Sequence, residues 1–424
     1  MSGAVTPSSI PDGRSPLSYP AYRAMWLAGV GSFMGSFVQQ VAEVWLMMDL
    51  TKSPLPVAML SAAFMGASLV MMLPAGALAD RYDRRKVVFA SQIVQLVASL
   101  TMAVLAYTGR ITPAALVAGQ ALLGLGMALG APAWAALVPE LVPRVLVAEA
   151  IALNSVAFNL ARAVGPAVGG IVLARFGTVF SFVFNAVTFA GVMVAVYIYR
   201  SKEPRVVTPR RPLVQTFAEP WSHLRGDTDL IHVFIAMIVF TLGAGIFYVL
   251  APAFGRETLK ATPLAYGVMI GALGGGAVLG ASIMKRLRSR VPPKVLIALT
   301  MLTFGTFSVA VSRAESVTAA TVLLVPAGIG WLGSFSSLQA LVQIWAPEPL
   351  RARVVAMYQL AHLATWAVAA VVAGFVADHL GIRTAMAAGA GVCALAALST
   401  WRLGLPRSFS GGVITIPPPD PNDR

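Results

Sequence analysis

The sequence has little charge. Only 11% of its 424 residues are Asp, Glu, Lys or Arg, whereas soluble domains carry about 25%. Hydrophobic residues make up 58% of the chain. A soluble fold has too little interior to bury that much apolar surface, so a soluble globular protein is excluded and the expected partner is a lipid bilayer.

Cysteine and histidine are also scarce. The chain has one cysteine, Cys393, and four histidines that are scattered without ligand spacing. A disulfide framework and a cysteine-based metal site are therefore excluded, and we expect neither a metal nor a cofactor. The nucleotide-binding pattern Gly-x-x-x-x-Gly-Lys-Ser/Thr is missing, as is any hydrolytic constellation. We therefore predict that the chain is not an enzyme and does not use ATP.

Positive charge is the one charge in excess. The net charge of +14 would suit a nucleic-acid partner, but the basic residues lie in short loops between apolar segments. Such loops are typical of the cytoplasmic side of a membrane protein. We therefore predict no nucleic-acid partner.

Long apolar segments are abundant. A spanning helix needs about 20 mostly apolar residues, and by this rule the chain is an all-α integral membrane protein with twelve transmembrane helices. The predicted limits are 23–49, 55–79, 87–108, 113–138, 149–174, 178–200, 230–254, 264–284, 294–312, 316–345, 353–378 and 383–404.

The distribution of Lys and Arg predicts the orientation. With the N-terminus inside, 23 of the 31 basic residues lie at the inner side, seven lie outside, and Arg162 lies within a helix. Because cytoplasmic loops are enriched in Lys and Arg, both termini are predicted to be cytoplasmic.

A long polar break divides the helices six and six. We predict a cytoplasmic N-terminal segment (1–21), a six-helix bundle (22–200), a basic cytoplasmic linker (201–229), a second six-helix bundle (230–404) and a disordered cytoplasmic tail (405–424). The linker would form either a helix on the inner leaflet or a solvated tether.

A weak internal repeat supports two parallel-related bundles. Gly76, followed by basic residues, is echoed by Gly280, 204 residues later, and Pro139-Glu140 is echoed by Pro347-Glu348. Repeats in the same order at nearly one offset are typical of transporters built from two similar halves.

The charged turn after the second segment carries the most specific pattern. It reads Gly-Ala-Leu-Ala-Asp-Arg-Tyr-Asp-Arg-Arg-Lys over 76–86, which resembles the signature loop of the major facilitator superfamily of transporters. The family pattern reads Asp-Arg-x-Gly-Arg, and its Gly is replaced by Asp83 here. The resemblance implies a gate at the cytoplasmic side, where Asp80 and the following arginines would pair across the two halves. The implied gating residues are Gly76, Asp80, Arg81, Arg84 and Arg85. Gly76 would let two helices approach closely; the alternative is a simple positively charged loop.

The fifth segment contains Gly165-Pro166-x-x-Gly169-Gly170. This run resembles the helix-5 motif of exporters and antiporters in the superfamily, although two upstream glycines of that motif are alanines here. Proline kinks a helix and glycine permits close contact, so the run is expected to form an interface near a gate. Ordinary small-residue packing is the alternative.

Wider stretches, including Val142-Pro-Arg144, Phe184–Phe189 and Thr262–Val268, are similar to the transmembrane secretion effector branch, which includes a bacterial enterobactin exporter. The resemblance extends from about Tyr22 to Trp401.

The first segment carries a polar stripe of Ser32, Ser36, Gln39, Gln40 and Glu43. Such a stripe would be costly in lipid, so we expect it to line a cavity. Glu43 is the candidate proton carrier, and an interfacial Glu bonded to Gln39 or Gln40 is the alternative.

The fourth segment weakens the case for proton coupling. The superfamily's helix-4 motif has an Arg where this chain has Gln120, at a depth where Gln120 and Glu43 could share a hydrogen bond. In the fifth segment, Arg162 shares a face with Ser155 and Asn159. Arg162 would bind an anionic cargo or a coupling acid, or it would be a structural Arg satisfied locally.

Aromatic and neutral polar residues lie in the second half. Gln359, His362 and Trp366 share one face, and Trp331, Thr241 and Tyr248 lie on other segments. This mix suits a bulky cargo with aromatic groups; helix packing is the alternative.

Together these patterns predict a monomeric multi-pass protein of the bacterial cytoplasmic membrane that exports a small organic molecule, such as a siderophore or a drug-like compound. Alternating access driven by proton antiport is the expected mechanism. An uncoupled or uptake permease for a metabolite or lipid, and a transport-inactive sensor or scaffold, remain alternatives.

Overall fold

The computed structural model describes residues 15–198, 221–222 and 224–402, and these residues form helices and no strand. Most of the predicted N-terminal segment, most of the linker and the predicted tail lie outside the described residues.

The first half contains α1 (Pro20–Thr51), α2 (Pro54–Arg81), α3 (Arg84–Tyr107), α4 (Pro113–Leu137) and α5 (Val147–Ile198). The second half contains α7 (Thr228–Ala253), α8 (Pro263–Leu287), α9 (Pro293–Arg313), α10 (Val317–Trp345), α11 (Arg351–Leu380) and α12 (Ile382–Arg402). Short turns of 3-10 or π helix are η1 (Pro16–Ser18), η2 (Val138–Leu141), η3 (Arg144–Leu146) and η4 (Phe254–Thr258).

Helix starts follow from local chemistry. Proline stands in the first turn of α1, α2, α4, α8 and α9, where its missing N–H costs no hydrogen bond. The hydroxyls of Thr112, Thr262 and Ser316 each accept a bond from a backbone N–H three residues later. Because these signals are local, the observed helix limits agree with the predicted ones within a few residues.

The predicted fifth and sixth helices are both contained in α5. The backbone leaves helical geometry at Gly177, which has φ 78° and ψ −178°. An L-residue with a side chain rarely adopts this φ, so the glycine permits the sharp turn between the two segments of α5.

Nine helices of the described part are long and apolar enough to cross a membrane, with Arg144–Ile198 taken as one. The helix α1 is not among them, because its polar stripe lowers its hydropathy, and the apolar part of α12 is shorter. The count of twelve crossings therefore stays a prediction.

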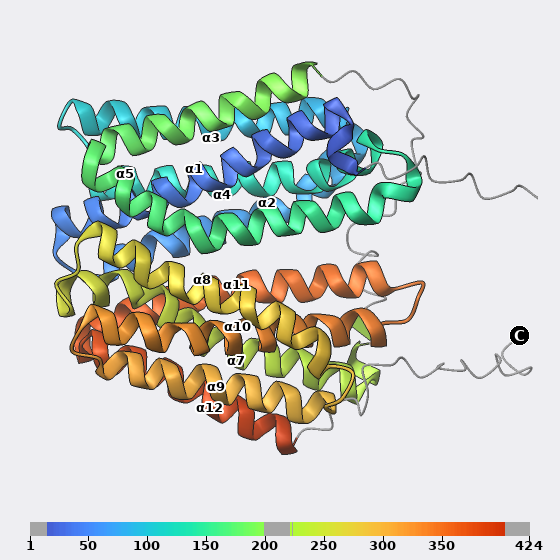
Figure 1. The fold of residues 1–424 in the computed structure, drawn as a ribbon, viewed down its shortest axis with the longest axis vertical. Helices are drawn as coiled ribbons and strands as arrows, with labels where there is room; N and C mark the ends of the chain where they lie inside the picture. The colour runs from blue at the N-terminus through green and yellow to red at the C-terminus, as the bar shows by residue number, and fades with distance from the viewer. Residues whose placement is uncertain (1–14, 199–220, 223, 403–424) are drawn as a thin grey trace, which may run out of the picture.

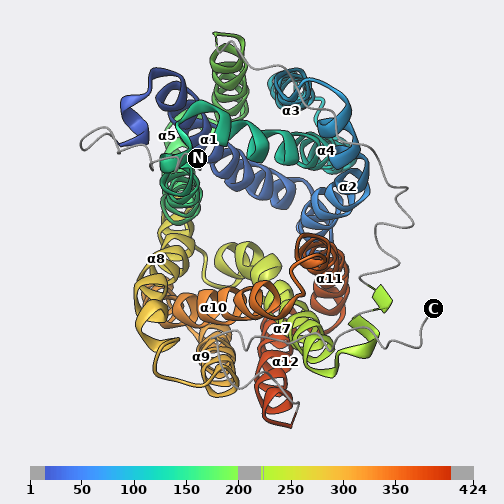
Figure 2. The same ribbon diagram turned by 90° about the vertical axis from the view of Figure 1, so that its right-hand side faces the viewer.

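The helices form two bundles, one from each half (Figure 1). Across the boundary, α5 packs on α8 and α2 packs on α11, on opposite sides of the molecule (Figure 2). Each contact joins the second helix of one half to the fifth helix of the other. This reciprocity is the arrangement expected for two halves related in parallel.

Two ends of the molecule are distinguished below. The turn at Lys52 and Ser53 lies at the α1–α2 end, and the turn at Tyr82 and Asp83 lies at the α2–α3 end.

Candidate transport pathway

Backbones of the two halves touch where α5 packs on α8. A Cβ built on Gly170 would lie 2.3 Å from the carbonyl oxygen of Pro263, and one on Gly267 would lie 2.4 Å from that of Pro166. These spacings leave no room for a side chain. Gly170 and Pro166, predicted as interface residues, do lie at the boundary between the halves.

The other two glycines of the predicted helix-5 interface face their own half. A Cβ on Gly165 would meet Phe37 at 2.6 Å, and one on Gly169 would meet Val38 at 3.0 Å. Both contacts are with α1. The motif thus packs α5 on two neighbouring helices, α1 and α8. The sequence pattern did not indicate which glycine faces which neighbour.

The second boundary contact closes the α1–α2 end between α2 and α11. A Cβ on Gly374 would lie 2.8 Å from the side chains of Leu55 and Ala58. Nearby, the Ser53 hydroxyl donates a hydrogen bond of 2.9 Å to the Asp378 carboxylate.

An ionic contact between the halves lies at the same end. Arg256 in η4 donates to the Trp45 carbonyl oxygen at 2.7 Å and forms an ion pair with Asp49. Its guanidinium also lies over the Trp45 ring, 5.5 Å from the centroid. We call Arg256, Asp49 and Trp45 the latch. The sequence analysis missed it, because no sequence signal relates residues 207 positions apart.

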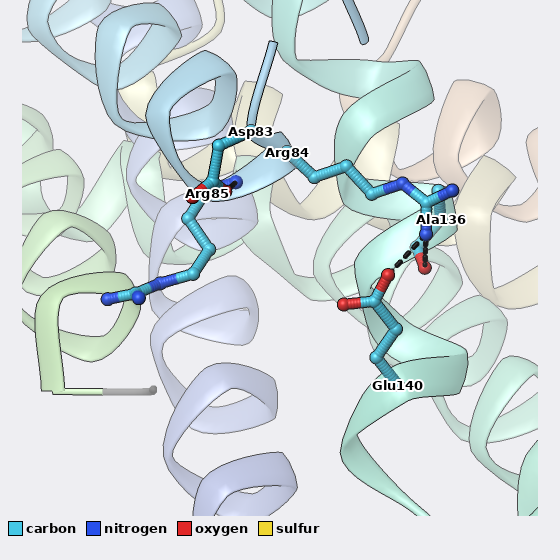
Figure 3. A network of polar contacts seen from close by, with 5 residues as sticks. All are labelled: Asp83, Arg84, Arg85, Ala136 and Glu140. Carbon is cyan, nitrogen blue, oxygen red and sulfur yellow. Dashed lines mark hydrogen bonds and ion pairs between the residues drawn. The ribbon is translucent and has the colours of Figure 1, made fainter. Parts of the chain in front are cut away.

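The gating motif lies at the opposite end, on α2 and α3. Figure 3 shows its Arg84 beside Ala136 and Glu140. Arg84 pairs with Glu140 and donates to the Ala136 carbonyl oxygen at 3.3 Å. Arg85 donates to the Val196 carbonyl oxygen at 3.0 Å. Asp83 accepts a bond of 2.8 Å from the Arg85 N–H, so it caps the start of α3 where the family pattern has Gly.

The bonds of Arg84 and Arg85 described above lie within the N-terminal half. Pairing of Asp80 and the arginines across the two halves stays a prediction. Gly76 makes no close approach, since a Cβ there would meet nothing within 4 Å. The reason is that α2 meets α11 around Leu55 and Ala58, near its opposite end. Asp80 and Arg81 are exposed.

Glu43 lies inside the N-terminal bundle and is fully buried. Its Oε1 accepts a bond of 2.7 Å from the Gln39 amide. The Gln39 carbonyl oxygen in turn accepts bonds from Ser99 at 2.8 Å and Asn185 at 2.7 Å. These two donors fix the Gln39 amide so that its NH₂ group faces Glu43. Glu43 Oε2 is buried without a hydrogen-bond partner.

The polar stripe of α1 is therefore split, which corrects the prediction of a single cavity face. Ser36 and Gln40 are exposed, whereas Gln39 and Glu43 are buried against α3 and the second segment of α5. Gln120 is also buried, but the described hydrogen bond of Glu43 goes to Gln39 and not to Gln120.

Arg162 reaches across the boundary into the C-terminal half. Its guanidinium lies over the Trp331 ring, 5.0 Å from the centroid. The two residues line a pocket between the halves, and the pocket's other lining residues are Tyr248, Ile270, Leu273, Gly274 and Ala277. On the same helix, Asn159 is exposed and donates to the Ser155 carbonyl oxygen at 2.8 Å.

An aromatic cluster includes Trp331 and Tyr248 of this pocket's lining. The Trp331 ring centroid is 5.3 Å from that of Tyr248 and 5.6 Å from that of Trp366. The His362 ring centroid lies 6.0 Å from that of Trp366, and His362 Nδ1 lies 3.1 Å from the Thr241 hydroxyl oxygen. The structure thus brings together residues of three helices, α7, α10 and α11, that the sequence analysis had singled out separately.

Gln359 is partly buried, with no described hydrogen bond to this cluster. Among the described residues, no group of three or more His, Cys, Asp and Glu side chains could hold a metal ion.

Known proteins resemble the chain over most of its length. It is 26% identical over 408 residues to the enterobactin exporter EntS of Salmonella typhimurium, covering 92% of this chain and 94% of that protein. It is 25% identical to EntS of Escherichia coli O1:K1, covering 90% and 91%. The staphyloferrin A transporter of Staphylococcus aureus is 23% identical over 37% of this chain and 40% of its own length.

Solved structures share the fold. A bacterial homolog of the human lysosomal transporter Spinster, in an inward-facing and unoccupied conformation, matches with a TM-score of 0.74 at 15% identity, covering 92% of this chain and 98% of that one. A POT family transporter in complex with a thioalcohol-conjugated peptide matches with a TM-score of 0.72 at 11% identity, covering 90% and 95%.

The family model for transmembrane secretion effectors matches residues 12–415. This match covers nearly the whole chain, and the two-bundle fold agrees with it. The protein is therefore a multi-pass protein of the bacterial inner membrane and a secondary transporter, and it belongs to the transmembrane secretion effector family of the major facilitator superfamily.

Proposed function

We propose that this protein exports a small organic molecule by alternating access. The pocket between the halves is the observation that carries the proposal. It is lined by Arg162 of one half and by Trp331 and Tyr248 of the other. Because both halves contribute to it, a rocking motion of one half against the other would change its access from one side to the other.

The conformation fits one step of that cycle. The latch, the α5–α8 contact and the α2–α11 contact near Leu55 join the halves toward the α1–α2 end. With both termini inside, as the loop charges predict, this end is the outer one, and the proposed state is closed to the outside. In the opposite state, Gly76 and Asp80 would meet the other half and close the inner end.

The cargo class follows from relatives and from the pocket together. Full-length relatives are named enterobactin exporters, and aromatic side chains surround the pocket of this chain. A siderophore or a drug-like compound is therefore the proposed cargo. One chain contains both halves of the pathway, so a monomer would suffice.

Proton antiport is the proposed energy source, with Glu43 as the coupling acid. Glu43 is the carboxylate that the fold buries completely inside the N-terminal bundle, and one of its oxygens has no partner. An unpaired carboxylate would be costly there, so the site favours the neutral acid in this conformation. Displacement of that proton to the inside when cargo binds in this state, and its replacement from the outside in the opposite state, would couple proton entry to export.

A second candidate is an uncoupled permease. Gln120 favours it, because it stands where the superfamily's helix-4 motif has Arg, and a neutral amide cannot exchange a proton with Glu43. Proton counting separates the two: an antiporter releases protons when cargo moves, whereas an uncoupled permease does not.

The test compares compounds in cells and medium between a deletion strain and the same strain carrying either wild type or Glu43→Gln, grown with and without iron. We expect a compound that leaves cells only when the wild-type protein is present. Equal export by the Glu43→Gln protein would keep the exporter and remove the coupling site. If no compound differs, export is refuted, and the uptake and sensor alternatives regain weight.

A further inference from the structure

We infer that Arg162, Trp331 and Tyr248 form a site for a molecule that carries a negative charge and an aromatic ring together. The inference rests on the proposed function, because it names the class of cargo that the boundary pocket would accept.

The charge of Arg162 calls for an anion. Among the residues that the structure describes, no carboxylate pairs with Arg162, and its described contact is the Trp331 ring. Glu43, the buried acid of the same half, is bonded to Gln39 instead. A guanidinium deep in a membrane protein without a counter-ion favours an anionic ligand, and a carboxylate matches its planar donors.

The walls of the pocket call for an aromatic group. Tyr248 and Trp331 line it with their ring centroids 5.3 Å apart, and Trp366 supports both at 5.7 Å and 5.6 Å. Ile270 and Leu273 add apolar surface. An inorganic anion would contact this wall without gain, whereas a ring would stack on it.

Small residues let the two halves approach closely at the pocket. Gly274 and Ala277 belong to the lining of the pocket and come from α8. Gly274 approaches α5 so closely that a Cβ on it would lie 2.4 Å from Ala163 Cα. The same close packing that joins the halves therefore brings Arg162 to the pocket.

The site excludes cationic cargo by the same charges. Arg162 is the charged residue of the described lining of the pocket, and no carboxylate belongs to that lining. A cation that stacked on Trp331 would compete with the guanidinium that already lies there.

The division of the site between the halves gives it a role in transport. Of the described lining residues, Arg162 alone comes from the N-terminal half. A ligand held by Arg162 through its charge and by Trp331 through its ring would tie the two halves together. The charge contact and the ring contact would then both be required for coupled movement.

The test is equilibrium binding to the purified full-length protein in lipid nanodiscs. The probes are 1-naphthoate, hexanoate, which is anionic without a ring, and 1-naphthylmethylammonium, which is aromatic and cationic. We expect 1-naphthoate to bind at one site per chain, and each of the other two probes to bind at least about tenfold more weakly, the loss typical of one charged hydrogen bond or one ring contact.

Variants locate the site. Arg162→Gln should weaken 1-naphthoate binding about 10- to 100-fold, and Arg162→Lys should retain part of the affinity because it keeps the charge. Trp331→Leu should weaken binding more than Trp331→Phe, which keeps a ring. The matched control is Arg175→Gln, which removes an exposed arginine of the same helix and should leave binding unchanged. Helical circular dichroism and elution volume confirm that each variant is folded.

Three results would overturn the inference: tighter binding of the cationic probe than of 1-naphthoate, equal or undetectable binding of all three probes, or unchanged 1-naphthoate binding by folded Arg162→Gln. The proposed function is judged separately by export from cells. Export of a neutral compound at equal rates by wild type and Arg162→Gln would discard this site and keep the exporter. Selective binding without export of any compound would keep the site and discard the exporter.

Discussion

Closure of the α1–α2 end depends on glycine at the α5–α8 contact, and Gly267→Ala should weaken it. The added Cβ would lie 2.4 Å from the Pro166 carbonyl oxygen and 2.9 Å from Ala167 Cα. Both are backbone atoms, which cannot rotate away as a flexible side chain can. One of the two helices must therefore shift away from the other. This shift destabilises the closed state, in which the two helices are in contact.

The size of the effect follows from the cost of inserting a methyl group into a packed contact, which is about 1–3 kcal/mol. Position 267 is helical in α8, so the gain in helix propensity applies to any conformation in which α8 is intact and cancels between the two states. The ratio of closed to open molecules should fall about 5- to 150-fold.

Gly275→Ala is the matched control. Gly275 lies on the same helix, and a Cβ there would meet nothing within 4 Å. Spin labels on cysteines introduced at Arg110 and Glu315 would report the separation of the halves, because both residues are exposed in turns at the α1–α2 end. The native Cys393 is fully buried and should not react.

We expect pulsed dipolar spectroscopy to show a longer distance for Gly267→Ala than for the wild type, and an unchanged distance for Gly275→Ala. Identical distance distributions for both variants would refute the reasoning that this contact holds the end closed. A longer distance for both would mean that the labels report helix propensity, not packing.

Four further perturbations test other parts of the proposal. Arg256→Gln and Asp49→Asn should each shift the same distance toward opening, and a double-mutant cycle should give a coupling of about 0.2–1 kcal/mol, as expected for a partly exposed pair; zero coupling would remove the latch. Glu43→Gln should abolish proton release on cargo addition to proteoliposomes but leave cargo binding intact, and undiminished release would exclude Glu43. Asp80→Asn should lower export at normal membrane abundance, whereas wild-type rates would contradict its role in the gate. Deleting 408–424 should leave export unchanged, and loss of export by a normally inserted protein would favour a tail-dependent role.

Some features of the site were within reach of the sequence and others were not. Arg162 was singled out because a charge within an apolar segment is costly wherever it lies. Its stacking on Trp331 was not predictable, because apolar periodicity orders residues along one helix and does not say which other helix that helix will contact. The same holds for the latch, which joins Arg256 to Asp49.

Glu43 shows how a one-dimensional pattern misleads. Ser36, Gln39, Gln40 and Glu43 are close on a helical wheel, so the sequence indicated a single cavity face. The stripe is wide enough to meet two environments: Gln40 is exposed, whereas Gln39 is held by Ser99 and Asn185 from other helices. Which part of a polar stripe faces a cavity is decided by the neighbouring helices.

By itself, the sequence determined the helical membrane class, the limits of the helices, the division into two halves and the family. These follow from apolar runs, caps, prolines and loop charge, all of which act within a few residues of the chain. Only the tertiary structure decided that Gly170 closes the boundary while Gly76 faces open space, and that Arg162 meets the aromatic cluster of the opposite half. The physical reason is that contacts between halves depend on how two separately folded bundles dock, and that docking changes with the conformational state while the helices themselves do not.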